Sequence, residues 1–191
     1  MLTLELSEEE TLRPAQLVAG QSYRIILQSV RQRTRLLREL SAWPAAAVVA
    51  QDGGLISNLD GWANLALPLR YHAVKVIGGL QGRVAELFAG CGLADWNEVE
   101  KLLGKYPDQL SIFERRILGF VRAMLIEPEL MIYDSIYDEL GPDEVTKVRR
   151  FDRLYHLYFP FRTSMLLSFG LDDDHERPLL HAESEPAREA C

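Results

Sequence analysis

The chain has 191 residues and a formal net charge of −7, and 48% of its residues are hydrophobic. Such values are typical of one globular domain with an apolar core, and the negative charge argues against nucleic-acid binding through bulk charge. The two cysteines, Cys91 and Cys191, are far apart, which favours a reducing compartment over a disulfide framework. No apolar run is long enough to span a bilayer and no signal pattern opens the chain. We therefore expect a soluble, cytoplasmic protein.

The first 40 residues predict two strands and a helix. In residues 2–6 leucines alternate with polar residues, which is the period of a half-buried strand, and residues 23–27 form a more buried strand. Ser29 is followed three residues later by Gln32. This S-x-x-Q spacing is that of a capping box, in which each side chain accepts a hydrogen bond from the other residue's backbone, and it predicts a helix through Leu40.

A third strand and a helical lobe are predicted for the middle of the chain. Residues 45–50 are continuously apolar, as in a buried strand. Residues 74–90 and 96–103 carry apolar side chains at the helical period, and they belong to a helical lobe expected over about residues 61–109. Cys91 has no histidine or second cysteine near it in the sequence, so we expect it to fill core space rather than to react or bind a metal.

The next segment predicts a helix and then a buried strand that ends in an acid. Ser111 and Glu114 form a second capping box, and apolar residues recur at the helical period until Pro128 ends the helix. Residues 130–133 form a short apolar strand that leads into Asp134. This order is typical of the second half of a nucleotide-binding α/β unit.

The last part of the chain predicts a helix, a strand and a tail. Residues 142–158 are expected to form one helix, and residues 165–168 a further strand. One domain is expected over residues 1–170, followed by a flexible acidic tail at 171–191. The run at 172–176 has the residue types of a metal cluster, but contiguous acids in a tail are more typical of a solvated segment.

These segments resemble an ABC transporter ATPase. Residues 106–111 are similar to the approach to the LSGGQ signature of that family, residues 127–130 to its PELL segment and residues 131–134 to its Walker B strand. The resemblance implies an α/β fold of the P-loop NTPase type, with a mainly parallel sheet and a helical lobe. The linker between the first helix and the third strand is too short for the family's antiparallel β-lobe, so we expect that lobe to be missing.

The resemblance places residues 27–34 on the Walker A loop, but every glycine of that loop is replaced. Arg33 occupies the position of the phosphate-binding lysine, and Thr34 that of the magnesium-binding hydroxyl. Glycines let successive backbone N–H groups face the phosphates, so their loss argues against a phosphate cradle. A residual anion site around Ser29, Arg33 and Thr34 is one interpretation. An ordinary helix N-terminus capped by Ser29 is the other, and we favour it.

Other positions to which the family assigns chemistry are altered as well. Ile112 and Phe113 replace the two signature glycines after Ser111. Ser135, which follows the Walker B residue Asp134, replaces the catalytic glutamate. Gly141 replaces the D-loop aspartate, and Phe169 replaces the switch histidine. Gln51 keeps the Q-loop position, although a solvated loop residue is the alternative interpretation of Gln51 alone.

The sequence leads to three hypotheses. The first is a non-catalytic pseudo-ATPase subunit of a membrane transport complex, which binds a permease or a second ATPase-like subunit, reaches the membrane only through that partner and needs no cofactor. Residues 51–55 and 64–69 together resemble the ATPases of bacterial MCE-type (Mla-type) lipid importers, which implies a lipid or organic-solvent substrate. The second is a transporter subunit with residual ATP and magnesium binding, whose weak hydrolysis a partner subunit completes. The third is a free-standing regulator.

Overall fold

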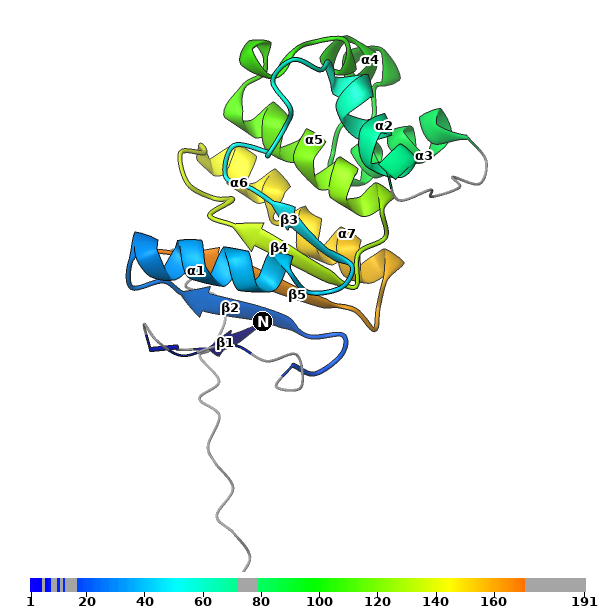
Figure 1. Cartoon of the computed structure of the whole chain (residues 1–191). Coiled ribbons are helices and arrows are strands. Elements are labelled where there is room, and N and C mark those ends of the chain that lie inside the picture. The colour runs from blue at the N-terminus through cyan, green and yellow to red at the C-terminus, as the bar shows by residue number, and fades with distance from the viewer. Residues whose placement is uncertain (5, 8–9, 11, 13–16, 72–78, 171–191) are drawn as a thin grey trace, which may run out of the picture.

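The computed structural model describes residues 1–4, 6–7, 10, 12, 17–71 and 79–170. The expected tail at 171–191, with its acidic run at 172–176, lies outside the described residues. Within the described residues, five strands form one sheet in the order β1-β2-β5-β4-β3, and every pairing among them is parallel (Figure 1). The predicted α/β class with a parallel sheet is therefore confirmed.

The strands lie where the apolar segments predicted them. Their bounds are Leu2–Leu4 for β1, Ser22–Ile26 for β2, Ala46–Val49 for β3, Leu130–Asp134 for β4 and Thr163–Ser168 for β5. All five residues of β4 are buried, as the continuous apolar run required. Because β2, β5 and β4 are parallel neighbours, the segments that follow them all begin at the same edge of the sheet.

Helices cover both faces of the sheet. The main helices are α1 (Val30–Ser41), α2 (Gly61–Tyr71), α3 (Leu80–Gly90), α4 (Trp96–Leu103), α5 (Ile112–Leu125), α6 (Pro142–Val148) and α7 (Arg150–Tyr158), with a short 3-10 turn, η2 (Pro107–Gln109). Figure 1 shows α1 against one face, α5, α6 and α7 on the other side, and α2 to α4 beyond α5.

Two helix predictions need correction. The expected helix at 74–90 begins at Leu80, and residues 72–78 lie outside the described residues. The single helix expected at 142–158 is two helices, α6 and α7, which meet at Arg149. Apolar residues continue at the helical period across this junction, as Val148 and Phe151 are both buried, so periodicity alone did not reveal the break.

The two capping boxes differ in outcome. At α5 the box is complete: the Glu114 backbone N–H donates to Ser111 Oγ over 3.1 Å, and the Ser111 N–H donates to Glu114 Oε2 over 2.7 Å. Burial raises the pKa of Glu114, but the hydrogen bonds from Ser111 and the ion pair with Lys105 outweigh it, so the pKa lies below its ordinary value. The carboxylate of Glu114 is therefore held in its charged form at the start of α5.

At α1 only half of the predicted box forms. The Gln32 backbone N–H donates to Ser29 Oγ over 3.1 Å, as predicted. The Gln32 carboxamide instead accepts from the Gln28 N–H over 2.8 Å and donates to the Leu6 carbonyl over 2.9 Å. Gln32 is 1% exposed, so its amide connects the start of α1 to the segment after β1 rather than to the cap itself.

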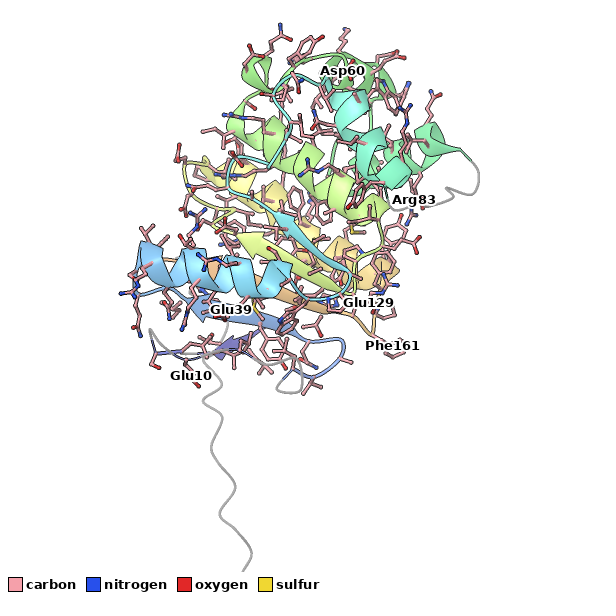
Figure 2. The ribbon with its side chains drawn as sticks, viewed as in Figure 1. Glu10, Glu39, Asp60, Arg83, Glu129 and Phe161 are labelled. Atoms are coloured by element: carbon pink, nitrogen blue, oxygen red, sulfur yellow. The ribbon has the colours of Figure 1, made fainter. Side chains whose placement is uncertain are left out.

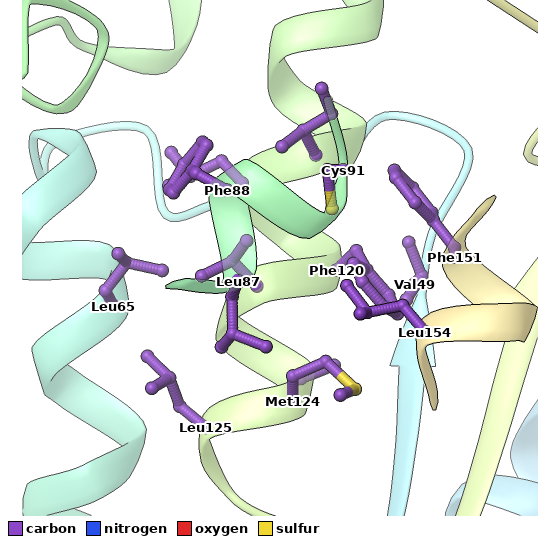
Figure 3. Close-up of a cluster of buried hydrophobic side chains, with 14 of the residues drawn as sticks. Val49, Leu65, Leu87, Phe88, Cys91, Phe120, Met124, Leu125, Phe151 and Leu154 are labelled. Atoms are coloured by element: carbon purple, nitrogen blue, oxygen red, sulfur yellow. The ribbon is translucent and has the colours of Figure 1, made fainter. Parts of the chain in front are cut away.

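A large apolar core lies between the sheet and the helices α3, α5 and α7 (Figure 3). In it the Phe120 ring stacks on Phe151, with 4.2 Å between ring centroids and 5° between planes. Cys91 is fully buried in the same core, and burial raises the pKa of its thiol to about 12. The expected packing role of Cys91 is confirmed.

Candidate functional site

The turn from β2 to α1 consists of three residues, and hydrogen bonds within the chain hold it. The N–H of Leu27 donates to the Ser168 carbonyl over 2.8 Å, and that of Gln28 donates to the side chain of Gln32 over 2.8 Å. Ser29 has extended backbone and caps the helix, receiving the N–H groups of Gln32 and Arg33 on its hydroxyl and carbonyl oxygens. A phosphate cradle needs successive N–H groups directed outward. Here these four N–H groups already have acceptors within the chain.

Arg33 is brought onto the acid at the tip of β4. Its Nε donates to Asp134 Oδ1 and its Nη2 to Asp134 Oδ2, each over 2.7 Å. This is a bidentate ion pair, and the Asp134 side chain is only 2% exposed. The hydrogen bonds to Asp134 raise the pKa of Arg33, although partial burial acts against them. A metal ion at Asp134 would therefore have to displace the guanidinium.

Thr34 lies apart from this pair. Its side chain is exposed, and its hydroxyl donates to the Val30 carbonyl one turn earlier in α1 over 2.9 Å. This is the ordinary back-bonding of a helical threonine. The structure therefore brings together the lysine and Walker B positions, Arg33 and Asp134, but not the position of the magnesium hydroxyl.

Gln51 lies beside Arg33 on the wall of a cavity of about 350 Å³, between α1, the loop after β3 and the start of α5. Its side-chain amide donates to Glu139 Oε1 over 3.3 Å and to Asp138 Oδ2 over 3.5 Å. Its carbonyl accepts from Arg116 Nε over 2.7 Å. Gln51 is thus half-buried and makes hydrogen bonds within the chain through both its side chain and its backbone.

Two glycines allow the loop after β3 to lie directly on α5. Gly53 has φ of +82°, and a Cβ there would be 2.3 Å from the Arg115 carbonyl oxygen. A Cβ at Gly119 would be 2.4 Å from the Gly53 carbonyl oxygen. Real Cβ atoms are not found at such distances, so both positions need glycine for this contact. The contact places Gln51 against α5.

Arg116 is the main residue of this site that sequence reasoning missed. It is fully buried, its Nε donates to the Gln51 carbonyl, and its Nη1 donates to the Ile136 carbonyl over 2.9 Å. Burial lowers the pKa of Arg116, while Asp138 and Glu139 act to raise it. The sequence feature that could have identified Arg116 is its position as a charged residue on the apolar stripe of α5, between Phe113 and Phe120. Arg116 connects the loops that follow β3 and β4.

Of the other positions singled out in the sequence, Ile112 lines this cavity, and the remaining ones do not. Ser111 is exposed and serves as the cap of α5, whereas Phe113 is buried in the core. Ser135 is 2% exposed with φ of +51°, and its hydroxyl has no partner among the described residues. Gly141 starts α6, and Phe169 is 44% exposed after β5. The altered positions are therefore spread over the carboxyl edge of the sheet rather than gathered into one site.

A second polar cluster lies at the opposite edge of the sheet. The hydroxyls of Ser22 and Ser164 both donate to Asp152, and both lie within 3.2 Å of His156 Nε2. The carboxylate and both hydroxyls are on the same side of the imidazole, while His156 Nδ1 is buried without a partner among the described residues. A hydrolase triad needs an acid on the ring nitrogen that faces away from the serine. These hydrogen bonds therefore connect α7 to β2 and β5 and have a structural role.

No family model matches the chain. Among curated proteins, it is 28% identical over 128 residues to the methionine import ATP-binding protein MetN 2 of Bacillus cereus. It is 30% identical over 95 residues to the probable ribonucleotide transport ATP-binding protein mkl of Mycobacterium tuberculosis. These matches cover 65% and 50% of this chain but only 35% and 25% of the relatives, so the chain spans well under half the length of either.

Two solved structures are similar in fold. CbiO1 from Clostridium perfringens, part of the ABC transporter complex CbiONQ, has a TM-score of 0.61 at 13% identity, covering 80% of this chain and 68% of that one. A dimeric ATP-binding cassette in a post-hydrolysis state, bound to ADP and Pi, has a TM-score of 0.52 at 20% identity, covering 65% and 52%. At these identities the likeness establishes the fold.

Proposed function

We propose that this chain, which has the fold of an ABC transporter ATPase, is a non-catalytic subunit of a membrane transport complex. The observation that carries the proposal is the bidentate pair between Arg33 and Asp134. Hydrolysis of ATP requires phosphates held by fixed donors, a bound metal and a positioned water. In this chain a guanidinium already occupies both oxygens of the acid that would hold the metal.

The phosphate-binding loop and the catalytic base position support the same conclusion. Four N–H groups at the β2–α1 turn and the start of α1 already have acceptors within the chain, so a phosphate bound by these groups would have to break existing hydrogen bonds. The residue after Asp134 is Ser135, whose hydroxyl is a poor base near neutral pH without an activator. Phe169, at the switch position, cannot hydrogen-bond a phosphate.

The exposed apolar residues favour protein contacts at the same edge of the sheet. Val30 follows β2 and Phe169 follows β5, and they are 66% and 44% exposed. Since β2 and β5 are parallel neighbours, both residues lie at the carboxyl edge, where a nucleotide would otherwise be bound. Apolar groups there suit a contact with a second ATPase-like subunit that needs no nucleotide.

The helical lobe offers a surface for a permease. On α2, Leu67 and Tyr71 are 42% and 85% exposed, and Ile56 in the preceding loop is 41% exposed. These residues lie within or next to the segment 51–69, which resembles the permease-facing part of the family. We assign the permease contact to this surface. The likeness of residues 51–55 and 64–69 to MCE-type importers supports a substrate of the lipid or organic-solvent class.

Co-purification from cells tests the proposal. Full-length protein should capture a permease or an ATPase-like subunit equally well from ATP-depleted and ATP-replete cells. Leu67→Asp should reduce the capture of the permease while leaving the fold intact. Phe161→Asp is the matched control, because Phe161 is 83% exposed at the other end of the molecule (Figure 2). Capture that appears only when ATP is present would instead support the subunit with residual ATP binding.

A further inference from the structure

We propose that the cavity beside Arg33 and Gln51 binds a small zwitterion, a molecule with one carboxylate and one ammonium group such as a free amino acid. The inference goes beyond the transport role, since it requires neither a permease nor a second subunit. It rests on the size of the cavity, on the charges that line it and on two guanidinium nitrogens that have no acceptor in the described part of the chain.

The size of the cavity suits a small molecule. Its volume of about 350 Å³ lies at the lower end of the range for small-molecule pockets, which is roughly 300–1,000 Å³. Ala50 and Ile112 give it an apolar part, and the remaining wall is polar and charged. This combination of an apolar surface with a few charged groups is typical of sites that orient a compact ligand.

The wall of the cavity carries charges of both signs. Arg33 is neutralised by Asp134, which leaves the cations Arg115 and Arg116 on α5 and the anions Asp52 and Glu139 on two loops. A simple anion would be attracted by the arginines but repelled by both acids, and a simple cation would meet the reverse. A ligand that carries both charges is attracted by both sets. A nucleoside triphosphate, with several negative charges and no cation, is disfavoured for the same reason.

Two hydrogen-bond donors, on Arg115 and Arg116, suit a carboxylate. Nε of Arg115 and Nη2 of Arg116 are buried and have no acceptor among the residues that the structure describes. Arg116 is fully buried, and the carbonyls of Gln51 and Ile136 hold its other nitrogens. Its free N–H group is therefore fixed in position before any ligand arrives. A carboxylate supplies two acceptor oxygens and suits such a pair of guanidinium donors.

The anionic side is also held in place. Glu139 has φ of +63°, a left-handed conformation that is uncommon outside glycine, and its carboxylate accepts from the Gln51 amide. Asp52 accepts from the Gly54 N–H over 2.9 Å. Both carboxylates keep further lone pairs that an ammonium group can use. The loops thus hold two acids at the cavity at the cost of backbone strain at Glu139.

Calorimetric titration of the full chain tests the inference. The probes are glycine, leucine, methionine and glutamate, with acetate, methylammonium and inorganic phosphate as single-charge comparisons. At least one amino acid should bind with a Kd of about 1 mM or tighter, and about tenfold tighter than each single-charge probe. Two results would overturn the inference: no amino acid binds at this level, or acetate or phosphate binds as tightly as the best amino acid.

Matched variants locate the site. Arg115→Gln and Glu139→Gln should each weaken binding of the amino acid by about tenfold, as expected when a hydrogen-bonded charge is lost. Arg153→Gln and Glu100→Gln, both at exposed positions outside the cavity, should leave the affinity unchanged. Circular dichroism establishes that each variant is folded. Unchanged affinity in folded Arg115→Gln and Glu139→Gln would refute the site.

Binding of MgATP, by contrast, would count against the proposed function and would leave the amino-acid result standing.

Discussion

Replacing Arg33 with alanine should destabilise the protein measurably, because it leaves the carboxylate of Asp134 buried without its cation. Breaking a buried ion pair on one side typically costs about 3–5 kcal/mol. The Arg33 side chain is 25% exposed, so water can reach part of the vacated space and solvate the acid. We therefore expect a loss of about 2–3 kcal/mol in the free energy of unfolding.

Urea denaturation followed by circular dichroism measures this loss. With an m-value of about 2 kcal/mol per molar, a loss of this size moves the midpoint down by roughly 1 M. Arg31→Ala is the matched control on the same helix, because Arg31 is exposed, and it should change the stability by less than about 0.5 kcal/mol.

A double-mutant cycle separates the ion pair from general damage to α1. Asp134→Asn removes the charge of the other partner, and the double variant removes both charges. We expect the double variant to lose less stability than the sum of the single losses, with an interaction free energy of at least about 1 kcal/mol. Additive losses, or an Arg33→Ala effect no larger than that of Arg31→Ala, would refute the argument.

Three further predictions follow from burial and charge. Leu65→Asp should prevent folding, because Leu65 is fully buried, whereas Leu67→Asp should leave the thermal midpoint nearly unchanged. Glu114→Gln should cost about 0.5 kcal/mol at pH 7. Folding lowers the pKa of Glu114, so its contribution to stability is present above the ordinary value of 4.5 and is lost as the pH falls through the lower folded pKa. Urea unfolding at pH 3 should therefore show a smaller difference in stability between Glu114→Gln and the unchanged protein. With the pKa of Cys91 at about 12, iodoacetamide at pH 8 should label this thiol only after unfolding, in a variant whose other cysteine is serine.

Most of the fold could be predicted from short-range patterns. The strands are short apolar runs, and the cap of α5 depends on Ser111 and Glu114, which are three residues apart. The break at Arg149 was missed because buried residues keep the same period in α6 and α7. The incomplete cap at α1 was missed because the Gln32 amide has a better partner in Leu6, which the local sequence does not reveal.

The site itself depends on contacts that are distant in the sequence. Arg33 and Asp134 were both singled out, but their pairing follows from the parallel sheet, which brings the start of α1 next to the end of β4. Arg116 could have been suspected, because a charge on an apolar helix face needs a partner. Its partners, the carbonyls of Gln51 and Ile136, are backbone groups, and only the fold shows where they lie.

The Arg33–Asp134 pair is proposed to leave no place for magnesium and nucleotide. Calorimetric titration of the full-length protein with MgATP tests it most directly. We expect no heat of binding up to about 1 mM nucleotide. Binding in the micromolar range that Asp134→Asn abolishes would contradict it, because that result would mean that nucleotide displaces Arg33 and uses Asp134 as a functional Walker B acid.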